Sequence, residues 1–336
     1  MIDETADRRT ELATHDIAAA VDHLYGLGVA ELRQLGGEYD QTFALTTDGG
    51  RRAVVKVYRA DEVGTVRWQH QLLDRLSGRV PVPEVLRGSD GADVALVDDD
   101  LCLSLYSWID GSLLSDLPEH PSELLVDWGR TAGNIVAGLA GVPENRQVAK
   151  THGWDLLAAP VTIGTILPLI DDPAQREVAL GAVETFETVI APHVADLPKG
   201  VVHQDLNDFN VFGDPARGRI TGVVDFADSL YTARVCEPAI TGAYAMLRKA
   251  DPLSALVDVA AGFDQVVRLD DTEISLLFPL AMIRLVCNAT IWTARRGGPA
   301  DDYGTARSQH TWQALAALRP IQLDQAEARL RATLNR

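Results

Sequence analysis

Cysteine is scarce in this sequence, with only three among 336 residues. Cys102, Cys236 and Cys287 lie far apart, and none has a partner at the short spacing that is typical of metal ligands. Small secreted domains that depend on disulfides carry many more cysteines. The sequence therefore argues against a disulfide framework and a cysteine zinc site, and it fits a reducing compartment.

Long apolar segments are missing as well. The opening segment Met1–Ala20 is polar and charged, without the apolar core of a secretory signal. No later uninterrupted run approaches the roughly 18 apolar residues of a membrane-spanning helix. We therefore expect a protein that is not exported, has no membrane partner and works in the cytoplasm.

Basic residues are outnumbered, with 30 Lys and Arg against 48 Asp and Glu, which gives a net charge of -18. Phosphate backbones are held by clustered Lys and Arg, so the charge argues against a nucleic-acid partner. A nucleotide remains compatible, because a divalent cation and one or two local bases can neutralise its phosphates. The acidity either serves solubility alone or suits a substrate that carries an amine, and composition leaves both interpretations open.

The N-terminal part of the chain shows strand patterns. After a helical opening at about 16–25, β-branched residues on both sides of a glycine turn predict a hairpin within 30–58. A helix is expected at about 62–76, and the prolines that follow cannot continue it. Further strands are expected at 92–97 and 101–108.

Beyond this point the apolar residues recur at helical spacing, for example over 124–139 and 180–190. The helical pattern is interrupted once, at 201–229, where two short apolar strands flank polar clusters. The sequence thus predicts an α+β protein with an N-terminal unit at 1–107 and a larger, mainly helical unit at 108–336.

The polar clusters carry the strongest chemical pattern. His203, Asp205 and Asn210 follow one apolar strand, and Asp225 follows the next. Phosphoryl transfer needs an acceptor that aligns the attacking hydroxyl and metal ions that bridge phosphate oxygens. Asp205 can accept the hydroxyl proton, and Asn210 can turn back to share a metal with Asp225. We expect His203 to hold the loop by hydrogen bonds.

Lys56 is the only charged residue in the apolar strand pattern Ala53–Tyr58. Burying an amine without a partner is costly, so a phosphate is a natural partner, while an edge-strand lysine facing water is the alternative. The glycine-containing segment Leu35–Phe43 precedes the hairpin, and it forms either a phosphate-binding loop or a plain turn.

The chain resembles the aminoglycoside phosphotransferase and choline kinase superfamily, within it the branch of the hydroxylysine kinases. The matching segments run through most of the chain: YGLGVAELRQLGGEYDQTFAL, AVVKVY, LSGRVPVPEVL, SWIDGSLL, HGWDL, HQDLNDFNVF and ITGVVDFADSLYTARVCEPAITGAYAML. The resemblance implies a two-lobed protein kinase-like fold, with a small antiparallel sheet in the N-terminal lobe and helices in the C-terminal lobe.

The resemblance also implies roles for individual residues. Lys56 would bind the phosphates of ATP or GTP, Asp205 would be the catalytic base, and Asn210 and Asp225 would hold Mg2+. The nucleotide base would meet the hinge, and the substrate would meet the helical lobe. The hinge residues are Ser104, Tyr106 and Trp108, and the substrate residues are Asp208, Asp228, Glu237 and Arg284. For these last four, an ordinary role in a loop or on a helix is equally open, and Arg284 could pair with a substrate carboxylate or with an internal acid.

Three positions depart from the family pattern. Gln69 stands where relatives carry the glutamate that orients the strand lysine, so either Glu62 substitutes for it or Lys56 is held more loosely. Gln204 and Ala227 each replace a glycine. Because every charged group of the base and metal site is retained, we expect activity to survive.

The leading hypothesis is a kinase for an amino alcohol or a hydroxylated amino acid, of hydroxylysine or homoserine type. An aminoglycoside phosphotransferase would suit the same acidic chain, and a non-catalytic kinase-like binding module is the hypothesis from another class. A protein kinase fits less well, because the chain after Asp228 leaves no room for a long activation segment. The sequence leaves open whether two copies pair as a homodimer.

Overall fold

The computed structural model describes residues 12–35, 41–145, 153–294 and 301–336. The chain divides into two compact units. Unit 1 runs to Asp110 and includes the later segment Gly222–Ala227, and unit 2 comprises Gly111–Thr221 and Asp228–Arg336. The later segment joins unit 1 through the backbone, where the Val223 amide donates to the Pro81 carbonyl oxygen at 2.8 Å.

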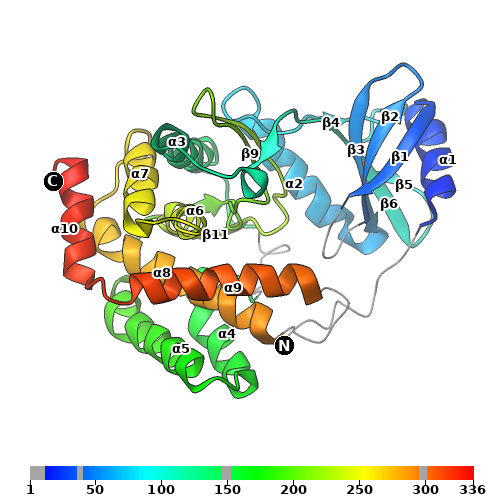
Figure 1. The fold of residues 1–336 in the computed structure, drawn as a ribbon. Coiled ribbons are helices and arrows are strands. Elements are labelled where there is room, and N and C mark those ends of the chain that lie inside the picture. The colour runs from blue at the N-terminus through cyan, green and yellow to red at the C-terminus, as the bar shows by residue number, and fades with distance from the viewer. Residues whose placement is uncertain (1–11, 36–40, 146–152, 295–300) are drawn as a thin grey trace. The chain divides into compact units, whose positions relative to one another are not determined.

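Unit 1 is built around a six-stranded sheet with the order β1-β2-β3-β6-β4, in which β5 also pairs with β6 (Figure 1). Its elements are α1 (Thr14–Tyr25), β1 (Val29–Leu35), β2 (Gln41–Thr47), β3 (Arg52–Arg59), a single helical turn at Ala60–Glu62, α2 (Val63–Leu76), β4 (Val85–Leu86), β5 (Ala95–Leu96) and β6 (Leu101–Ser107). The pairs β2–β3 and β3–β6 are antiparallel. The predicted hairpin is confirmed as β2 and β3, and the helices predicted at about 16–25 and 62–76 are confirmed as α1 and α2. Strand β1 was not predicted as a separate strand.

The two faces of this sheet pack against different helices. One face buries alternate residues such as Val55 and Leu103 against Ile17 and Val21 of α1. The opposite face buries Cys102 with Val66 of α2 in a smaller cluster. Because successive side chains of a strand point to opposite faces, Lys56, which follows Val55, points to the face that carries α2.

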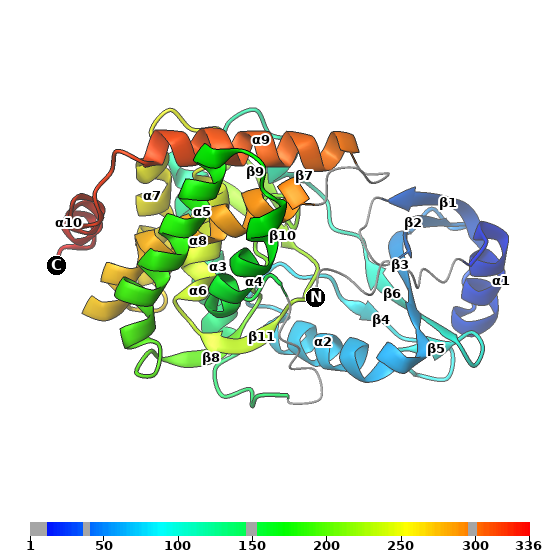
Figure 2. The ribbon, with the colours of Figure 1, turned by 90° about the horizontal axis from the view of Figure 1, so that it is seen from below.

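Unit 2 is mainly helical (Figures 1 and 2). Its helices are α3 (Ser122–Gly138), α4 (Ala159–Ile166), α5 (Pro173–Thr185), α6 (Cys236–Ala245), α7 (Pro252–Asp264), α8 (Asp271–Ala294), α9 (Asp301–Leu318) and α10 (Leu323–Leu334). Single helical turns lie at Leu114–Asp116, Leu156–Ala158, Leu167–Leu169, Phe186–Ile190 and Ala191–His193.

Short strands frame the polar segment of unit 2. They are β7 (Ser112–Leu113), β8 (Lys199–Val202), β9 (Val211–Asp214), β10 (Arg219–Val223), whose last two residues belong to unit 1, and β11 (Leu230–Ala233). One small sheet has the order β10-β9-β7, and β11 pairs with β8 in another. The strands at 201–202 and 220–224 were predicted, but β7, β9 and β11 were not.

Two glycines let α3 and α7 approach closely. A Cβ at Gly129 of α3 would lie 1.9 Å from the Val259 carbonyl oxygen, and a Cβ at Gly262 of α7 would lie 1.8 Å from the Val126 carbonyl oxygen. Both neighbours are backbone atoms, which cannot move aside as a flexible side chain can. Glycine is therefore required on both sides of this helix contact.

Helix α8 forms the core of unit 2. It is long and apolar enough to cross a membrane, but 89% of that apolar stretch is buried inside the protein, as in the core helix of a globular unit. It contacts α4, α5, α6, α9 and α10. Arg284 lies within this helix and is only 1% exposed.

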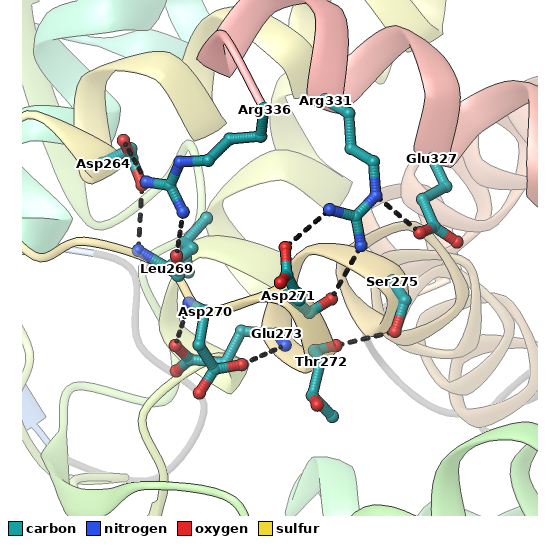
Figure 3. A network of polar contacts seen from close by, with 10 residues as sticks. All are labelled: Asp264, Leu269, Asp270, Asp271, Thr272, Glu273, Ser275, Glu327, Arg331 and Arg336. Carbon is teal, nitrogen blue, oxygen red and sulfur yellow. Dashed lines mark hydrogen bonds and ion pairs between the residues drawn. The ribbon is translucent and has the colours of Figure 1, made fainter.

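The start of α8 is fixed by a polar network (Figure 3). Asp270 and Glu273 cap the helix reciprocally, each side chain accepting from the other's backbone amide at 2.8–2.9 Å. From α10, Arg331 pairs with Asp271 at 2.6 Å. Arg336 pairs with Asp264, at the end of α7, at 3.0 Å. The network ties the last helix to the core of unit 2.

Candidate functional site

The loop between β8 and β9 carries the predicted base. Its first two residues, His203 and Gln204, are fully buried. His203 accepts a hydrogen bond on Nδ1 from the Asp205 amide at 3.2 Å, so the prediction that His203 holds the loop by hydrogen bonds is confirmed. The Asn210 amide donates to the Asn207 carbonyl oxygen at 3.1 Å, which closes the loop before β9.

The carboxylate of Asp205 is oriented by three donors. Oδ2 accepts from Nδ2 of Asn207 and from Nδ2 of Asn210, each at 2.8 Å. Oδ1 accepts from Nη2 of Arg284 at 2.7 Å. The side chain remains 22% exposed. Asp205 is thus held in one orientation with part of its surface accessible, as a group that must align an incoming hydroxyl requires.

Gln204 adopts a left-handed backbone conformation, with φ 69°. This conformation is natural for glycine, and for another residue it costs about 1–2 kcal/mol. Two contacts hold Gln204 there. Its amide donates to Oε2 of Glu237 at 3.2 Å, and its side-chain Nε2 donates to the Trp154 carbonyl oxygen at 3.2 Å. The replacement of glycine by Gln204 therefore adds an anchor beneath the loop.

Glu237 lies at the start of α6 and is fully buried. Burial raises the pKa of its carboxyl to about 7, although the backbone hydrogen bond from Gln204 acts in the opposite direction. Its Oε1 has no hydrogen-bond partner. Glu237, expected as a substrate residue, lies beneath the loop between β8 and β9 and supports it.

Asp208 and Asp228, the other acidic residues expected near the substrate, differ in their surroundings. Asp208 is 4% exposed and pairs through Oδ2 with Nη2 of Arg248 at 3.0 Å. Arg248 also donates to the Ser115 carbonyl oxygen at 3.0 Å, so this pair closes one side of the loop. Asp228 is partly exposed in a turn before β11.

In unit 1, Lys56 and Asp225 come together. Nζ of Lys56 lies 3.5 Å from Oδ1 of Asp225, and the side chains are 19% and 43% exposed. Asp225, like Gln204, has a left-handed backbone, with φ 65°. The structure thus places the predicted phosphate-binding amine beside a partly exposed carboxylate that could bind a cation.

Of the predicted hinge residues, Ser104 and Tyr106 lie on β6, and Trp108 follows its last residue. Ser104 is directly opposite Lys56 in the β3–β6 register, and its hydroxyl donates to the Asp93 carbonyl oxygen at 3.2 Å. The Tyr106 hydroxyl lies 2.9 Å from Nε2 of His70 in α2. The Trp108 ring stacks with the guanidinium of Arg52, whose Cζ lies 4.7 Å from the ring centroid.

The glutamate missing from α2 is not replaced by Glu62. Oε2 of Glu62 accepts from the Arg59 amide at 3.1 Å, so this carboxylate caps the turn that precedes α2. Gln69 lies in α2 and is 9% exposed. Of the two alternatives left by the sequence, the cap formed by Glu62 favours the more loosely held Lys56.

Each unit offers an oxygen atom of the kind that a magnesium ion prefers. Because Nδ2 of Asn210 donates to both the backbone and the carboxylate of Asp205, the Asn210 side chain is oriented with its oxygen available to a cation. In unit 1, the partly exposed carboxylate of Asp225 offers oxygen atoms as well. Among the described residues, no three His, Cys, Asp or Glu side chains cluster as metal ligands. A site in which phosphate oxygens complete the shell requires no such cluster.

Parts of two predicted segments fall outside the described residues: the glycine-containing segment at 36–40 and the histidine of the HGWDL motif at 152. Several residues of the site were missed by the sequence analysis. Asn207 and Arg248 gave no signal beyond their place in or near the motifs, and the contact between Gln204 and Glu237 spans 33 residues.

Comparison with known proteins identifies the family. Residues 31–271 match the phosphotransferase enzyme family. The chain is 24% identical to the hydroxylysine kinase of Danio rerio over 97% of its own length and 96% of the relative's. It is 29% identical to the homoserine kinase of Methylocella silvestris over 73% of the chain and 79% of the relative.

Solved structures confirm the fold prediction. An amicoumacin kinase in complex with AMP-PNP, Ca2+ and Ami superimposes with a TM-score of 0.69 at 14% identity, covering 94% of this chain and 97% of that one. A microcompartment-associated aminopropanol kinase gives 0.63 at 17% identity, covering 95% and 100%. The predicted kinase-like α+β fold is therefore confirmed.

Proposed function

Because the chain belongs to the phosphotransferase enzyme family, we propose that it is a magnesium-dependent kinase for an amino alcohol or a hydroxylated amino acid. The observation that carries the proposal is the orientation of the Asp205 carboxylate by three donors, at 2.7–2.8 Å, in a loop that follows a buried strand. Phosphoryl transfer depends mainly on positioning and electrostatics, and this arrangement supplies the positioning.

Asp205 would accept the proton of the substrate hydroxyl as that oxygen attacks the γ-phosphate. Oδ2 already accepts from two donors, but Oδ1 accepts from Arg284 alone and retains a second lone pair, so the exposed part of the side chain can receive the hydroxyl there. The asparagine amides fix the plane of the carboxylate. The hydroxyl would therefore meet an acceptor of fixed direction.

The remaining site residues would act on the nucleotide. Lys56 would exchange its contact with Asp225 for the phosphates, and Asn210 and Asp225 would hold Mg2+. Bound magnesium would neutralise the charge on the phosphate oxygens. The segment of β6 with Ser104 and Tyr106, continued by Trp108, would receive the base of ATP or GTP.

The acceptor is inferred from the relatives and the charge. Relatives that align over most of this chain are hydroxylysine and homoserine kinases, and both names denote a hydroxylated amino acid. A chain with net charge -18 attracts an amine. Asp228 is partly exposed and is the acid that we propose for the amine, since Asp208 is only 4% exposed.

A coupled assay of nucleoside diphosphate release tests the proposal. Magnesium and ATP, and separately GTP, are supplied with hydroxylysine, homoserine, ethanolamine, choline, sugars or aminoglycosides, with Asp205→Ala as the control. Release that depends on a hydroxylated amine and is lost in the variant supports the proposal. Release with aminoglycosides alone would favour antibiotic modification, and absence of both turnover and a nucleotide-induced thermal shift would favour a non-catalytic module.

We also propose a cytoplasmic location. The three cysteines are buried and free, and burial raises the pKa of the Cys102 thiol to about 11 and that of Cys287 to about 12. Thiols of this kind are unreactive and form no disulfide framework. Fractionation of cells that express the tagged chain would test the location.

A further inference from the structure

Among the described residues of unit 2, Arg284 is the most deeply buried arginine. It lies in the apolar core helix α8, and it is 1% exposed. An isolated charge in such a place would cost several kcal/mol, so its partners explain why it is there. The pKa of Arg284 is raised: burial acts to lower it, but Tyr244 and Asp205 more than offset that effect.

The two terminal nitrogens of Arg284 are used inside unit 2. Nη2 donates to Oδ1 of Asp205 at 2.7 Å, and Nη1 donates to the Trp154 carbonyl oxygen at 3.0 Å. The guanidinium carbon also lies 5.0 Å from the Trp154 ring and 5.5 Å from the Tyr244 ring, within the range of cation–π contacts. These contacts fix the guanidinium in place and direct one of its donors at the base.

The Trp154 carbonyl oxygen links this arginine to the loop a second time. It accepts from Nε2 of Gln204 at 3.2 Å as well as from Arg284. Gln204 is the residue immediately before Asp205 and has the left-handed backbone. The backbone of the loop and the carboxylate of the base are therefore anchored to the same buried point.

We propose that Arg284 is a positioning residue of the phosphoryl-transfer reaction, which acts by fixing the Asp205 carboxylate and does not bind the substrate. The inference rests on the proposed function, and it gives Arg284 a different role from a partner of a substrate carboxylate. Its burial and its two internal hydrogen bonds support this role, because a guanidinium engaged in this way has no terminal nitrogen turned to solvent.

The chemistry explains why a base would be held by an arginine. In a loose transition state the attacking oxygen forms little bond to phosphorus, so aligning the hydroxyl matters more than removing its proton early. Asn207 and Asn210 restrain one carboxylate oxygen, and Arg284 restrains the other. Displacing a catalytic group by about 1 Å can lower a rate about a hundredfold.

The test compares Arg284→Met and Arg284→Lys with a matched control. Methionine keeps most of the buried volume and removes the donors, and lysine keeps the charge but not the fork of two donors. Arg234→Met is the control, because Arg234 forms a comparable pair with the fully buried Glu273, at 2.7 Å, outside the catalytic loop. We expect kcat to fall about a hundredfold in Arg284→Met and about tenfold in Arg284→Lys. The KM values of nucleotide and acceptor should stay within about twofold in both, and Arg234→Met should lower the melting temperature without lowering kcat.

Equal kcat values for Arg284→Met and the control would overturn the inference, and so would a loss confined to the KM of the acceptor, which would assign Arg284 to the substrate. The pair is also tested without turnover, through the melting temperatures of Arg284→Met, Asp205→Asn and the double variant. Non-additive shifts support the coupling of Arg284 to Asp205, and additive shifts contradict it. If the wild type turns over no substrate, the proposed function fails and the role of Arg284 in the reaction fails with it, whereas additive melting-temperature shifts in an active enzyme contradict the inference alone.

Discussion

Replacing Glu237 by glutamine measures how much the buried carboxylate beneath the loop between β8 and β9 lowers the free energy of unfolding. Glu237 is fully buried, and its pKa in the folded protein is about 7, against an ordinary value of 4.5, chiefly because burial disfavours the charged form. Glutamine has a similar shape and can still accept from the Gln204 amide, but it carries no charge at any pH of interest.

The sign of the effect follows from proton binding. Between pH 4.5 and about 7 the folded protein keeps a proton on Glu237 that the unfolded chain has released. Stability therefore falls as the pH rises through this window, and above it the loss is constant. At about 1.4 kcal/mol for each pKa unit, the rise from 4.5 to about 7 costs the wild type about 3 kcal/mol at pH 8.

Urea titrations at pH 4.5 and pH 8 check this value. The free energy of unfolding of Glu237→Gln relative to wild type should increase by about 3 kcal/mol from the lower to the higher pH. Glu184→Gln, at an exposed position of α5, changes the net charge equally and should show no such increase. A difference between Glu237→Gln and wild type that is the same at both pH values would refute the reasoning.

Two further predictions concern packing and nucleotide binding. Gly262→Ala should lower the free energy of unfolding by about 3 kcal/mol, because its new methyl group meets the Val126 carbonyl oxygen. The control is Gly181→Ala in α5, where no atom lies within 4 Å of the new Cβ, and it should be neutral or stabilise by up to about 1 kcal/mol. Equal urea midpoints for the Gly262→Ala and Gly181→Ala variants would contradict the close contact of α3 and α7. Lys56→Met should lose most of the rise in melting temperature that magnesium and nucleotide cause, measured by scanning fluorimetry. A full rise in the variant would remove Lys56 from the phosphate site.

Local patterns in the sequence were sufficient for the larger elements. The hairpin of β2 and β3 and the helices α1, α2 and α3 have clear periodicity, so their existence could be predicted. Strand β1 was missed because its residues are half-buried or exposed without strict alternation. The two-residue strand β7 was missed because a strand so short exists only through its pairing with β9.

Part of the candidate site was likewise predictable. The spacing of His203, Asp205 and Asn210 within one loop indicates a phosphotransferase base, and local hydrogen bonds hold this loop together. The supports beneath it were not predictable as pairs. Arg284 was noticed as a charge in an apolar run, but its contact with Asp205 joins residues 79 positions apart and depends on how α8 packs in unit 2.

The positions that depart from the family pattern are explained partly by contacts between residues far apart in the sequence. The residue at position 204 needs a left-handed backbone, which a sequence containing glutamine there does not suggest. Its side chain compensates by bonding to the Trp154 carbonyl oxygen, a contact that spans 50 residues. Glu62 is close in sequence to the position of the missing acid, but it caps the turn before α2.

Direct detection of the product tests the central claim most closely. Phosphorus NMR would follow wild type and Asp205→Asn with magnesium, nucleotide and the acceptor that the panel selects. The account predicts a phosphate monoester of that acceptor with the wild type, and none at matched enzyme concentration with the variant, which keeps the shape of the side chain but cannot take the proton. A monoester formed at the same rate by Asp205→Asn would contradict the assignment of the base, and nucleotide hydrolysis without a monoester would contradict the proposed reaction.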